Sequence, residues 1–304
     1  MKPPIGAVGI VGAGAVGQTV GTLLVAAGWC AEVCVTSGTE ESAAGLVTDL
    51  QDMAEVTGSP VRAVRAPLAG MGACDAVVIC PRAKFSNART SDVRMAGLAA
   101  NAPLLASIGQ ALNGYAGVAA VVTNPVDVMA RIFAERSGAC RVYGIGSSTD
   151  SARYRLSLAD RLGVAPSAVQ GQVIGEHGDA AVVCAAATRV HGQPVPVPVD
   201  QVRRDFADRP RQITAGIGRA RSGPAGAVLA VLTAALGITD SVVEVSVSHG
   251  GGWYGIPLRF TAGVPTLAVP GLAPDERRAL AAASSKLAAA YRAAVHPNEG
   301  DPLP

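Results

Sequence analysis

Short apolar runs alternate with amphipathic stretches through the first half of the chain. The runs predict buried strands at residues 5–11, 32–36, 61–64, 76–80 and 118–123. Between them, apolar positions at helical spacing predict helices at residues 18–27, 41–53 and 94–112. Strands that alternate with helices are typical of a parallel, doubly wound α/β sheet, the Rossmann arrangement. We therefore expect a domain of this architecture over residues 1–146.

The pattern changes after Gly146. A helix is expected over 151–162, a strand-like run from near Val169 to Ile174, and a proline-rich hairpin at 190–200. A long helical stretch over 202–236, broken near Gly223-Pro224, precedes candidate strands at 242–247, 255–260 and 266–269 and a helix over 274–293. This mixture predicts an α+β substrate domain over residues 147–304. Because no linker-like segment separates the halves, we expect the second domain to pack against the first.

Composition narrows the class of protein. The 304 residues are 49% hydrophobic and 16% charged, and the formal net charge is +2. That balance gives no reason to expect binding to nucleic acid or to a membrane. The N-terminus has no signal-peptide layout, and the six cysteines are scattered without CxxC spacing. We expect a cytoplasmic protein with reduced thiols and no metal site.

A glycine-rich turn follows the first predicted strand. Its residues fit the pattern GxGxxG, with Gly12, Gly14, Ala15, Val16 and Gly17 as the candidate cofactor-binding positions. The first glycine permits the tight turn, the second lets a pyrophosphate approach the backbone, and the third lets helix pack on strand. The helix that follows supplies N–H donors and a positive dipole end. The turn predicts that the domain over residues 1–146 is a dinucleotide-binding domain.

The residues after the second strand leave the choice between NAD and NADP open. An acidic side chain normally holds the ribose 2′-hydroxyl of NAD there, but the segment reads VTSGT, with no acid before Glu40. Ser37 could hydrogen bond the ribose of NAD. The small polar residues could also admit a 2′-phosphate, although no arginine stands nearby and Glu40 with Glu41 would repel it.

The second half holds a histidine in a polar turn, GEHGD at 175–179, after the run that ends at Ile174. Asp150 directly precedes the helix expected over 151–162, and Arg153 lies in the first turn of that helix. The two residues are three positions apart, so they lie on one face of the helix. Taken singly, His177 reads as a turn histidine and the other two as a surface ion pair. Together, they could take a proton from a hydroxyl and clamp a carboxylate, which suits oxidation of a 2-hydroxy acid to a 2-oxo acid.

Three motifs in register carry a family resemblance: TNPVDV at 123–128, TDSARYR at 149–155 and GEHGD at 175–179. With the glycine turn, they make the chain resemble the L-lactate/malate dehydrogenase family over nearly its whole length. The resemblance implies a hydride transfer between NAD or NADP and a small 2-hydroxy acid/2-oxo acid pair. It also implies a homodimer or homotetramer.

The resemblance also implies residue roles. His177 corresponds to the histidine that exchanges a proton with substrate, Asp150 to the carboxylate that orients it, and Arg153 to the arginine that binds the substrate carboxylate. Asn124 corresponds to an asparagine that contacts substrate and cofactor. The family's carbonyl-polarising arginine lies seven residues before an asparagine, which favours Arg94, ahead of Asn101, over Arg82 and Arg89.

The loop before Arg94 departs from the family pattern, because it is longer and lacks the usual hinge glycine. The position that sets substrate specificity falls at Ala88 or, with a shift of one residue, at Arg89. We hypothesise that Arg89 pairs with a second anionic group, so that a malate-like or other anionic substrate is favoured.

Three alternatives remain open. One is a lactate-type enzyme or an enzyme for 2-hydroxy acids with bulky side chains. In the family the segment at 222–226 lines the substrate pocket, and its small residues here, SGPAG, could admit a bulkier substrate side chain. Another is a non-catalytic dinucleotide-binding protein. The third is a related glycosidase fold that uses NAD and a metal; this would need a Cys–His pair, and no cysteine adjoins His177.

Overall fold

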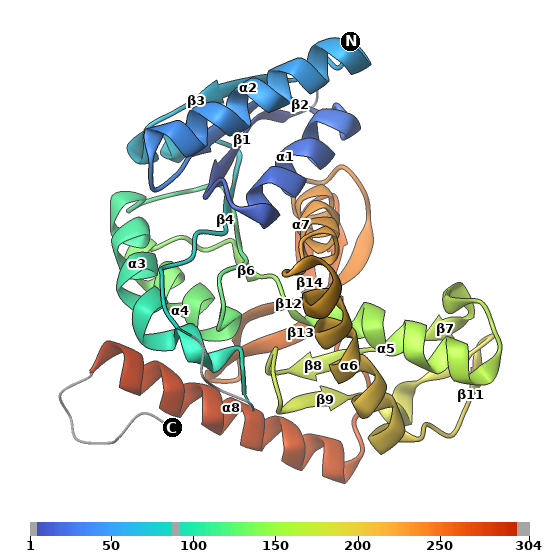
Figure 1. Ribbon diagram of the computed structural model, residues 1–304. Helices are drawn as coiled ribbons and strands as arrows, with labels where there is room; N and C mark the ends of the chain where they lie inside the picture. The colour runs from blue at the N-terminus through green and yellow to red at the C-terminus, as the bar shows by residue number, and fades with distance from the viewer. Residues whose placement is uncertain (1–4, 87–91, 297–304) are drawn as a thin grey trace.

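The computed structural model describes residues 5–86 and 92–296. Its N-terminal half is a parallel sheet with strand order β3-β2-β1-β4-β5-β6 (Figure 1). The strands span Ile5–Val11 (β1), Cys30–Thr36 (β2), Arg62–Arg65 (β3), Ala76–Ile79 (β4), Val118–Val121 (β5) and Val142–Gly144 (β6). This strand order is that of a Rossmann domain, as the alternating pattern predicted. The carboxyl ends of β1 and β4 meet beside the glycine turn, where ligands of such sheets bind.

Helices connect these strands: α1 (Ala15–Ala27), α2 (Glu40–Thr57), α3 (Leu98–Ala111) and α4 (Val126–Ser137). The expected helices agree within a few residues at each end. The sequence reading missed α4 and β6. In α4, Val126 to Ala130 are buried in succession, as are Ile132 and Phe133, whereas Arg131, Glu135 and Arg136 are half-buried or exposed. The polar face therefore begins only after a fully buried first turn, and β6 is only 3 residues long.

The C-terminal half extends the same sheet with antiparallel strands. Beyond β6 the order continues β12-β13-β8-β9, and Ser246 in β12 pairs with Gly144 in β6. These strands span Ser241–His249 (β12), Gly252–Thr261 (β13), Val173–Gly175 (β8) and Ala181–Val183 (β9), and β14 (Val264–Leu267) pairs with β13. The two halves therefore pack together as expected. The division after residue 146 falls between β6 and α5 and remains a proposal.

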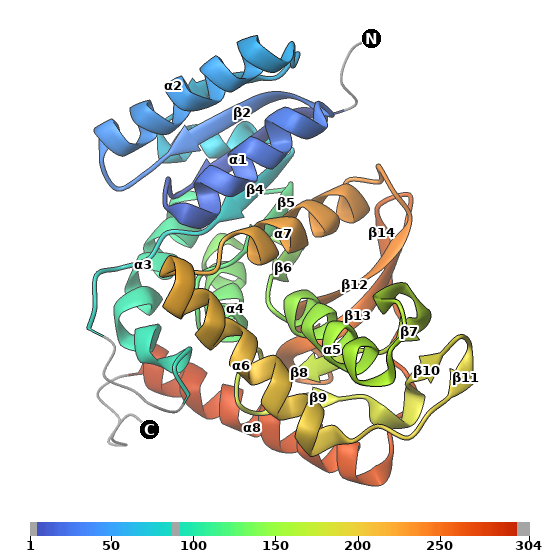
Figure 2. The same ribbon diagram turned by 45° about the vertical axis from the view of Figure 1, so that its right-hand side comes forward.

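Helix α5 (Ser147–Leu162) packs on β8 and β12, α6 (Val199–Ile217) packs on α5, and α7 (Ser222–Ala235) lies between α1 and β12 (Figure 2). The expected helix break is present, but it lies at residues 218–221, a few residues before Gly223-Pro224, which belong to the first turn of α7, where proline is tolerated. The apolar run from Val169 is not one strand. It splits into β7 (Val169–Gln170) and β8, which belong to different sheets.

The split between β7 and β8 has a packing reason at Gly171. A Cβ there would lie 2.4 Å from the ring of Tyr154, so the chain passes close against α5. The proline-rich segment forms a short hairpin of β10 (Arg189–Val190) and β11 (Gln193–Pro194), which pairs with β7.

The last helix, α8 (Pro274–Val295), crosses the base of the molecule and contacts both halves (Figure 1). It packs on α3 and α4 of the N-terminal half and on β8, β9 and β13 of the C-terminal half. Its buried residues Ala283, Leu287 and Ala290 fix it against these elements. Within the described ranges, no helix is both long enough and apolar enough to span a bilayer.

Candidate active site

The turn after β8 brings His177 to Asp150 in the first turn of α5. His177 Nδ1 lies 2.6 Å from Asp150 Oδ2, and the Asp150 side chain is only 1% exposed. Gly146, which caps α5, makes this approach possible, because a Cβ there would lie 2.4 Å from His177 Cγ. The pairing fixes Nδ1 as the ring nitrogen toward the carboxylate, which leaves Nε2 to exchange a proton with a bound molecule.

Two arginines approach Asp150 from other directions. Arg153, one turn along α5, places Nη1 3.2 Å from Asp150 Oδ1. Arg94 places Nη2 3.7 Å from the same oxygen. Arg94 lies in the turn before a short 3-10 helix (Met95–Gly97) that leads into α3. The structure therefore brings together four residues from three separate segments of the sequence.

The charges of this cluster shift one another's proton affinities. Burial alone would raise the pKa of Asp150, but His177, Arg94 and Arg153 outweigh it and hold that pKa below its ordinary value. Burial, followed by the charge of Arg94, lowers the pKa of His177, against the opposing effect of Asp150. The ring is therefore neutral near pH 7 and is able to accept a proton.

Asn101 joins the loop after β4 to the segment after β5. Its Oδ1 accepts from Ala83 N at 2.9 Å, and its Nδ2 donates to Asn124 O at 2.8 Å. Asn101 is 2% exposed, so both bonds are shielded from water. Asn124 is exposed at the carboxyl end of β5.

Arg89 and Ala88 lie outside the described residues, so the structure says nothing of the predicted specificity position.

Asp127 is a buried carboxylate beside His177 that the sequence reading did not single out. Its Oδ2 accepts from the His177 backbone N–H at 2.8 Å. Burial, reinforced by the nearby charges of Glu176 and Asp150, raises the pKa of Asp127 to about 7. In the sequence, only its position inside the motif TNPVDV could have pointed to Asp127. There it resembles an ordinary acidic residue at the start of a helix.

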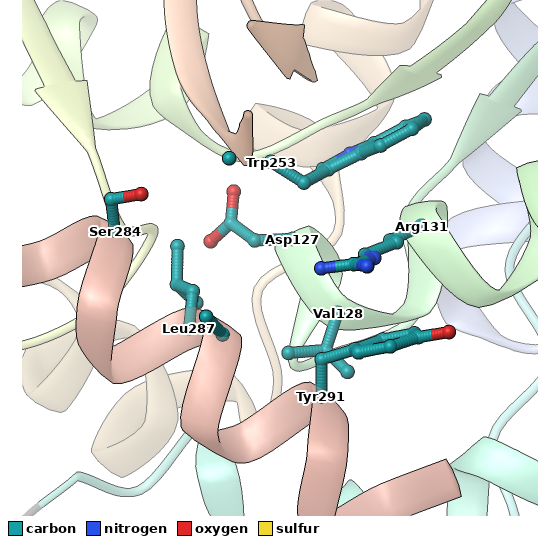
Figure 3. A pocket seen from close by; sticks show the side chains of 9 residues that line it. Asp127, Val128, Arg131, Trp253, Ser284, Leu287 and Tyr291 are labelled. Atoms are coloured by element: carbon teal, nitrogen blue, oxygen red, sulfur yellow. The ribbon is translucent and has the colours of Figure 1, made fainter. Parts of the chain in front are cut away.

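A small cavity of about 10 Å³ lies behind Asp127, on the side of β13 and α8 (Figure 3). The Asp127 carboxylate points into the space beside Ser284, Leu287 and Trp253. Asp127 Oδ1 and Trp253 Nε1 both lack a hydrogen-bond partner among the described residues. A cavity of this size has room for about one water molecule.

The glycine turn has the form that a pyrophosphate requires. Gly12 has φ +112°, and a Cβ there would lie 2.8 Å from Pro81 N. A Cβ on Gly17 would lie 1.9 Å from Gly12 O, so only glycine lets α1 pack on the turn. Gly14 differs from both, because a Cβ there would meet nothing within 4 Å. Ala15 and Val16 begin α1, whose N-terminal N–H groups face the same turn.

Ser37 is tied to this turn at the end of β2. Its hydroxyl accepts from Ala13 N at 3.2 Å, which connects the second strand to the glycine turn. The residues that follow are exposed, and Thr39 caps α2 by accepting from Ser42 N at 3.2 Å. Glu40 and Glu41 form the exposed first turn of α2.

Potential metal ligands are not clustered in the parts of the chain that the structure covers. No group of three or more His, Cys, Asp or Glu residues is arranged there to hold an ion.

The six cysteines are free thiols. Cys30, Cys34, Cys74 and Cys184 are buried, Cys80 is partly buried and Cys140 is exposed.

Comparison with known proteins agrees with this architecture. The chain is 33% identical over 190 residues to an L-lactate dehydrogenase of Staphylococcus saprophyticus, a match that covers 61% of this chain and 59% of that protein. It is 29% identical over 282 residues to an L-lactate dehydrogenase of Bacillus velezensis, covering 88% of this chain and 87% of that one.

Solved structures share the fold. The malate dehydrogenase of Cryptosporidium parvum superposes with a TM-score of 0.86 at 24% identity, over 97% of this chain and 99% of that one. The lactate dehydrogenase of the same organism gives 0.87 at 23% identity, over 96% and 98% of the two chains.

Two family models cover most of the chain. Residues 7–144 match the NAD binding domain of lactate/malate dehydrogenases, and residues 148–295 match their alpha/beta C-terminal domain. The chain belongs to the lactate/malate dehydrogenase family.

Proposed function

We propose that this protein is an NAD-dependent oxidoreductase that interconverts a 2-hydroxy acid and a 2-oxo acid. His177 takes the hydroxyl proton during oxidation and returns it during reduction. Asp150 orients the ring and stabilises its charged form. Arg153 binds the substrate carboxylate through paired hydrogen bonds, and Arg94 polarises the substrate carbonyl.

One observation carries this proposal: the convergence of His177, Arg153 and Arg94 on the buried carboxylate of Asp150. A binding module has no need of a proton acceptor, paired with a carboxylate and flanked by two cations. The same arrangement suits a substrate that carries a carboxylate beside a hydroxyl. It therefore favours the enzyme over a non-catalytic dinucleotide-binding protein.

The residues of the glycine turn fit a dinucleotide. We assign Gly12, Gly14, Ala15, Val16 and Gly17 to the pyrophosphate, because the backbone at Gly14 is open to a ligand and α1 begins there. When bound, NAD would supply or accept the hydride. Asn124, at the end of β5, would contact both cofactor and substrate.

NADP is a second candidate cofactor. Ser37 is the polar residue at the end of β2, and no acidic side chain precedes Glu40 to contact the ribose. We propose that Ser37 hydrogen bonds the ribose and that discrimination between NADH and NADPH is weak.

For the substrate, we propose a malate-like or other anionic 2-oxo acid. Arg209 on α6 is close enough to Arg153 for its charge to contribute to the lowered pKa of Arg153, which burial causes in the first place. A second anionic group on the substrate would meet a positive field there, and Arg89 is our candidate for pairing with it. A bulkier side chain remains the alternative, because a Cβ on Gly223 would meet only Thr149, at 3.8 Å.

Initial rates across a panel of 2-oxo acids test these proposals together. Pyruvate, oxaloacetate and branched or aromatic acids would each be assayed with NADH and with NADPH, using cofactor absorbance. We expect turnover, with oxaloacetate preferred over pyruvate. Arg89→Gln should lower kcat/KM for oxaloacetate by more than about tenfold and spare monocarboxylates. Equal effects on both would make Arg89 a solvated loop charge. No turnover with any acid would contradict the proposed reaction.

We also propose that the chain assembles as a cytoplasmic homodimer or homotetramer, as the family resemblance implies. Sedimentation equilibrium or light scattering measures the mass in solution directly. A monomer at micromolar concentration would contradict the proposal on assembly and leave the reaction untouched.

A further inference from the structure

We propose that Lys286 on α8 is a positioning residue, which fastens the turn carrying Arg94 to the turn carrying His177. The proposal rests on the function proposed above, because Arg94 and His177 are the residues that would act on the substrate. Lysine is rare in this chain, with Lys2, Lys84 and Lys286 against many arginines. Lys286 bridges two carboxylates from distant parts of the sequence, Asp92 and Glu176.

The first contact holds the segment that carries Arg94. Lys286 Nζ lies 2.8 Å from Asp92 Oδ2. The Asp92 backbone N–H donates to Asp179 Oδ2 at 2.8 Å, so Asp92 is held at two points. Met95 N–H donates to Asp92 O at 3.0 Å, which closes a turn around Arg94. Fixing Asp92 therefore fixes the backbone on both sides of Arg94.

The second contact holds the segment that carries His177. Lys286 Nζ lies 2.8 Å from Oε1 and 2.9 Å from Oε2 of Glu176, the residue directly before His177. The Glu176 side chain is 2% exposed, and its Oε2 also accepts from Ala180 N at 2.8 Å. A carboxylate this well buried needs a cation beside it, so this half of the bridge also stabilises the fold.

The helix that carries Lys286 is a rigid platform. Leu287 and Ala290 on α8 are buried in the main core, and the helix contacts both halves of the molecule. Arg94, by contrast, lies between β4 and α3 and outside both elements. A shift of about 1 Å in a reacting group can cost about a hundredfold in rate, so a contact beside Arg94 affects catalysis.

Asp92→Asn is the sharpest test, because it cuts only one half of the bridge. Asp92 has φ +49°, a region that asparagine tolerates and most other residues do not. The asparagine side chain has the same shape as aspartate, and the backbone N–H at position 92 remains. The substitution leaves Lys286 paired with Glu176. Amide hydrogen exchange without substrate should show protection over residues 92–98 lowered about tenfold, with other regions unchanged.

Kinetics supply the second readout of Asp92→Asn. We expect kcat for 2-oxo acid reduction to fall about tenfold, while KM for the acid and Kd for NADH change less than about twofold. This split follows because Arg153, not Arg94, holds the substrate carboxylate. The difference from wild type should shrink at 1 M salt, where the screening length is only about 3 Å.

Changes at Lys286 separate positioning from folding. Lys286→Met leaves Glu176 unpaired and is expected to destabilise the protein, so Lys286→Met is combined with Glu176→Gln. The double variant should melt near the wild-type temperature and still behave as Asp92→Asn. Lys286→Arg should restore kcat and protection. Arg278→Met removes an exposed cation from the same helix and should match wild type.

The outcomes discriminate cleanly. Unchanged protection over residues 92–98 in both Asp92→Asn and the double variant would overturn the bridge. Lowered protection with unchanged kcat in an active enzyme would overturn its role in positioning. If the wild type reduces none of the acids, the proposed function fails, and hydrogen exchange alone still decides whether Lys286 holds the turn.

Discussion

The cluster around Asp150 and the glycine turn at residues 12–17 hold their geometry by different means. In the cluster, side-chain charges are held in a shielded position, with Asp150 1% exposed and in contact with three partners. In the turn, the essential feature is the absence of side chains, since a Cβ on Gly17 would lie 1.9 Å from backbone. Substitutions in the cluster should therefore act mainly through lost or unpaired charge, whereas substitutions in the turn should act through the backbone.

The largest effect is expected at His177. His177→Ala removes the proposed proton acceptor, and turnover should fall by at least about a hundredfold. Because His177 lies on a different segment from the glycine turn, NADH binding measured by fluorescence titration should remain within about twofold of wild type. A variant that turns over at a near-normal rate would refute the assignment of His177.

Two glycines of the turn, Gly14 and Gly17, are expected to respond differently to the same added methyl group. Gly17→Ala should destabilise the protein by more than about 2 kcal/mol, because the added methyl group meets the carbonyl of Gly12. Gly14→Ala meets nothing within 4 Å, so it should fold nearly as well as wild type. It should nevertheless weaken NADH binding about tenfold or more, because the methyl group would stand where the pyrophosphate approaches.

Thermal melting and NADH titration of the two variants decide this point. Equal melting temperatures for Gly14→Ala and Gly17→Ala would contradict the packing argument. Unchanged NADH affinity in Gly14→Ala would show that the pyrophosphate lies elsewhere.

A smaller effect is expected in the pH dependence of Arg94→Gln. The positive charge of Arg94 helps burial to lower the pKa of His177, so removing it should raise that pKa toward the ordinary value of 6.5. Oxidation of a 2-hydroxy acid needs the neutral ring, which is present only above this pKa. The acid limb of kcat/KM should therefore move to higher pH in the variant. A limb that stays in place or moves to lower pH would mean that Arg94 lies too far from the ring in solution.

Cofactor choice should shift modestly in Ser37→Asp. The added carboxylate can accept from the ribose hydroxyls of NADH and would repel a 2′-phosphate. We expect the ratio of kcat/KM for NADH over NADPH to rise about tenfold from a weak preference in wild type. A several-hundredfold preference for NADH in wild type would show that another residue supplies the missing contact.

The last effect concerns how stability depends on pH through Asp127. Its pKa is raised from 3.8 to about 7, so between these values the folded state binds more protons than the unfolded state. Wild type should therefore lose stability as pH rises through this window, and the contribution is constant above it. Asp127→Asn does not titrate, and its Oδ1 can still accept from His177 N–H. Denaturant titrations at pH 5 and pH 8 should favour the variant more at pH 8.

Most of the N-terminal fold could be predicted from the sequence because buried parallel strands read as apolar runs between amphipathic helices. Strand β1 begins and ends where the apolar run does, at Ile5–Val11. The same reasoning failed for α4, because its first turn is buried from Val126 to Ala130 and its half-buried or exposed polar residues begin only at Arg131. It also failed at the run from Val169, because the interruption at Gly171 depends on close packing against the ring of Tyr154 on α5, which the run itself does not reveal.

The residue types of the site and the order of the motifs could be predicted from the amino-acid sequence. Glycines at fixed spacing, a histidine in a polar turn and an aspartate–arginine pair on one helix face are local properties, and local spacing is visible in a sequence. The distances between these groups and the residues that surround them depend on the folded chain. The carboxylate of Asp127 behind His177, and the bridge from Lys286 to Asp92 and Glu176, join residues about 50 to 194 positions apart. No periodicity encodes such contacts, because they arise where the turn after β8 meets α4 and α8 in the folded chain.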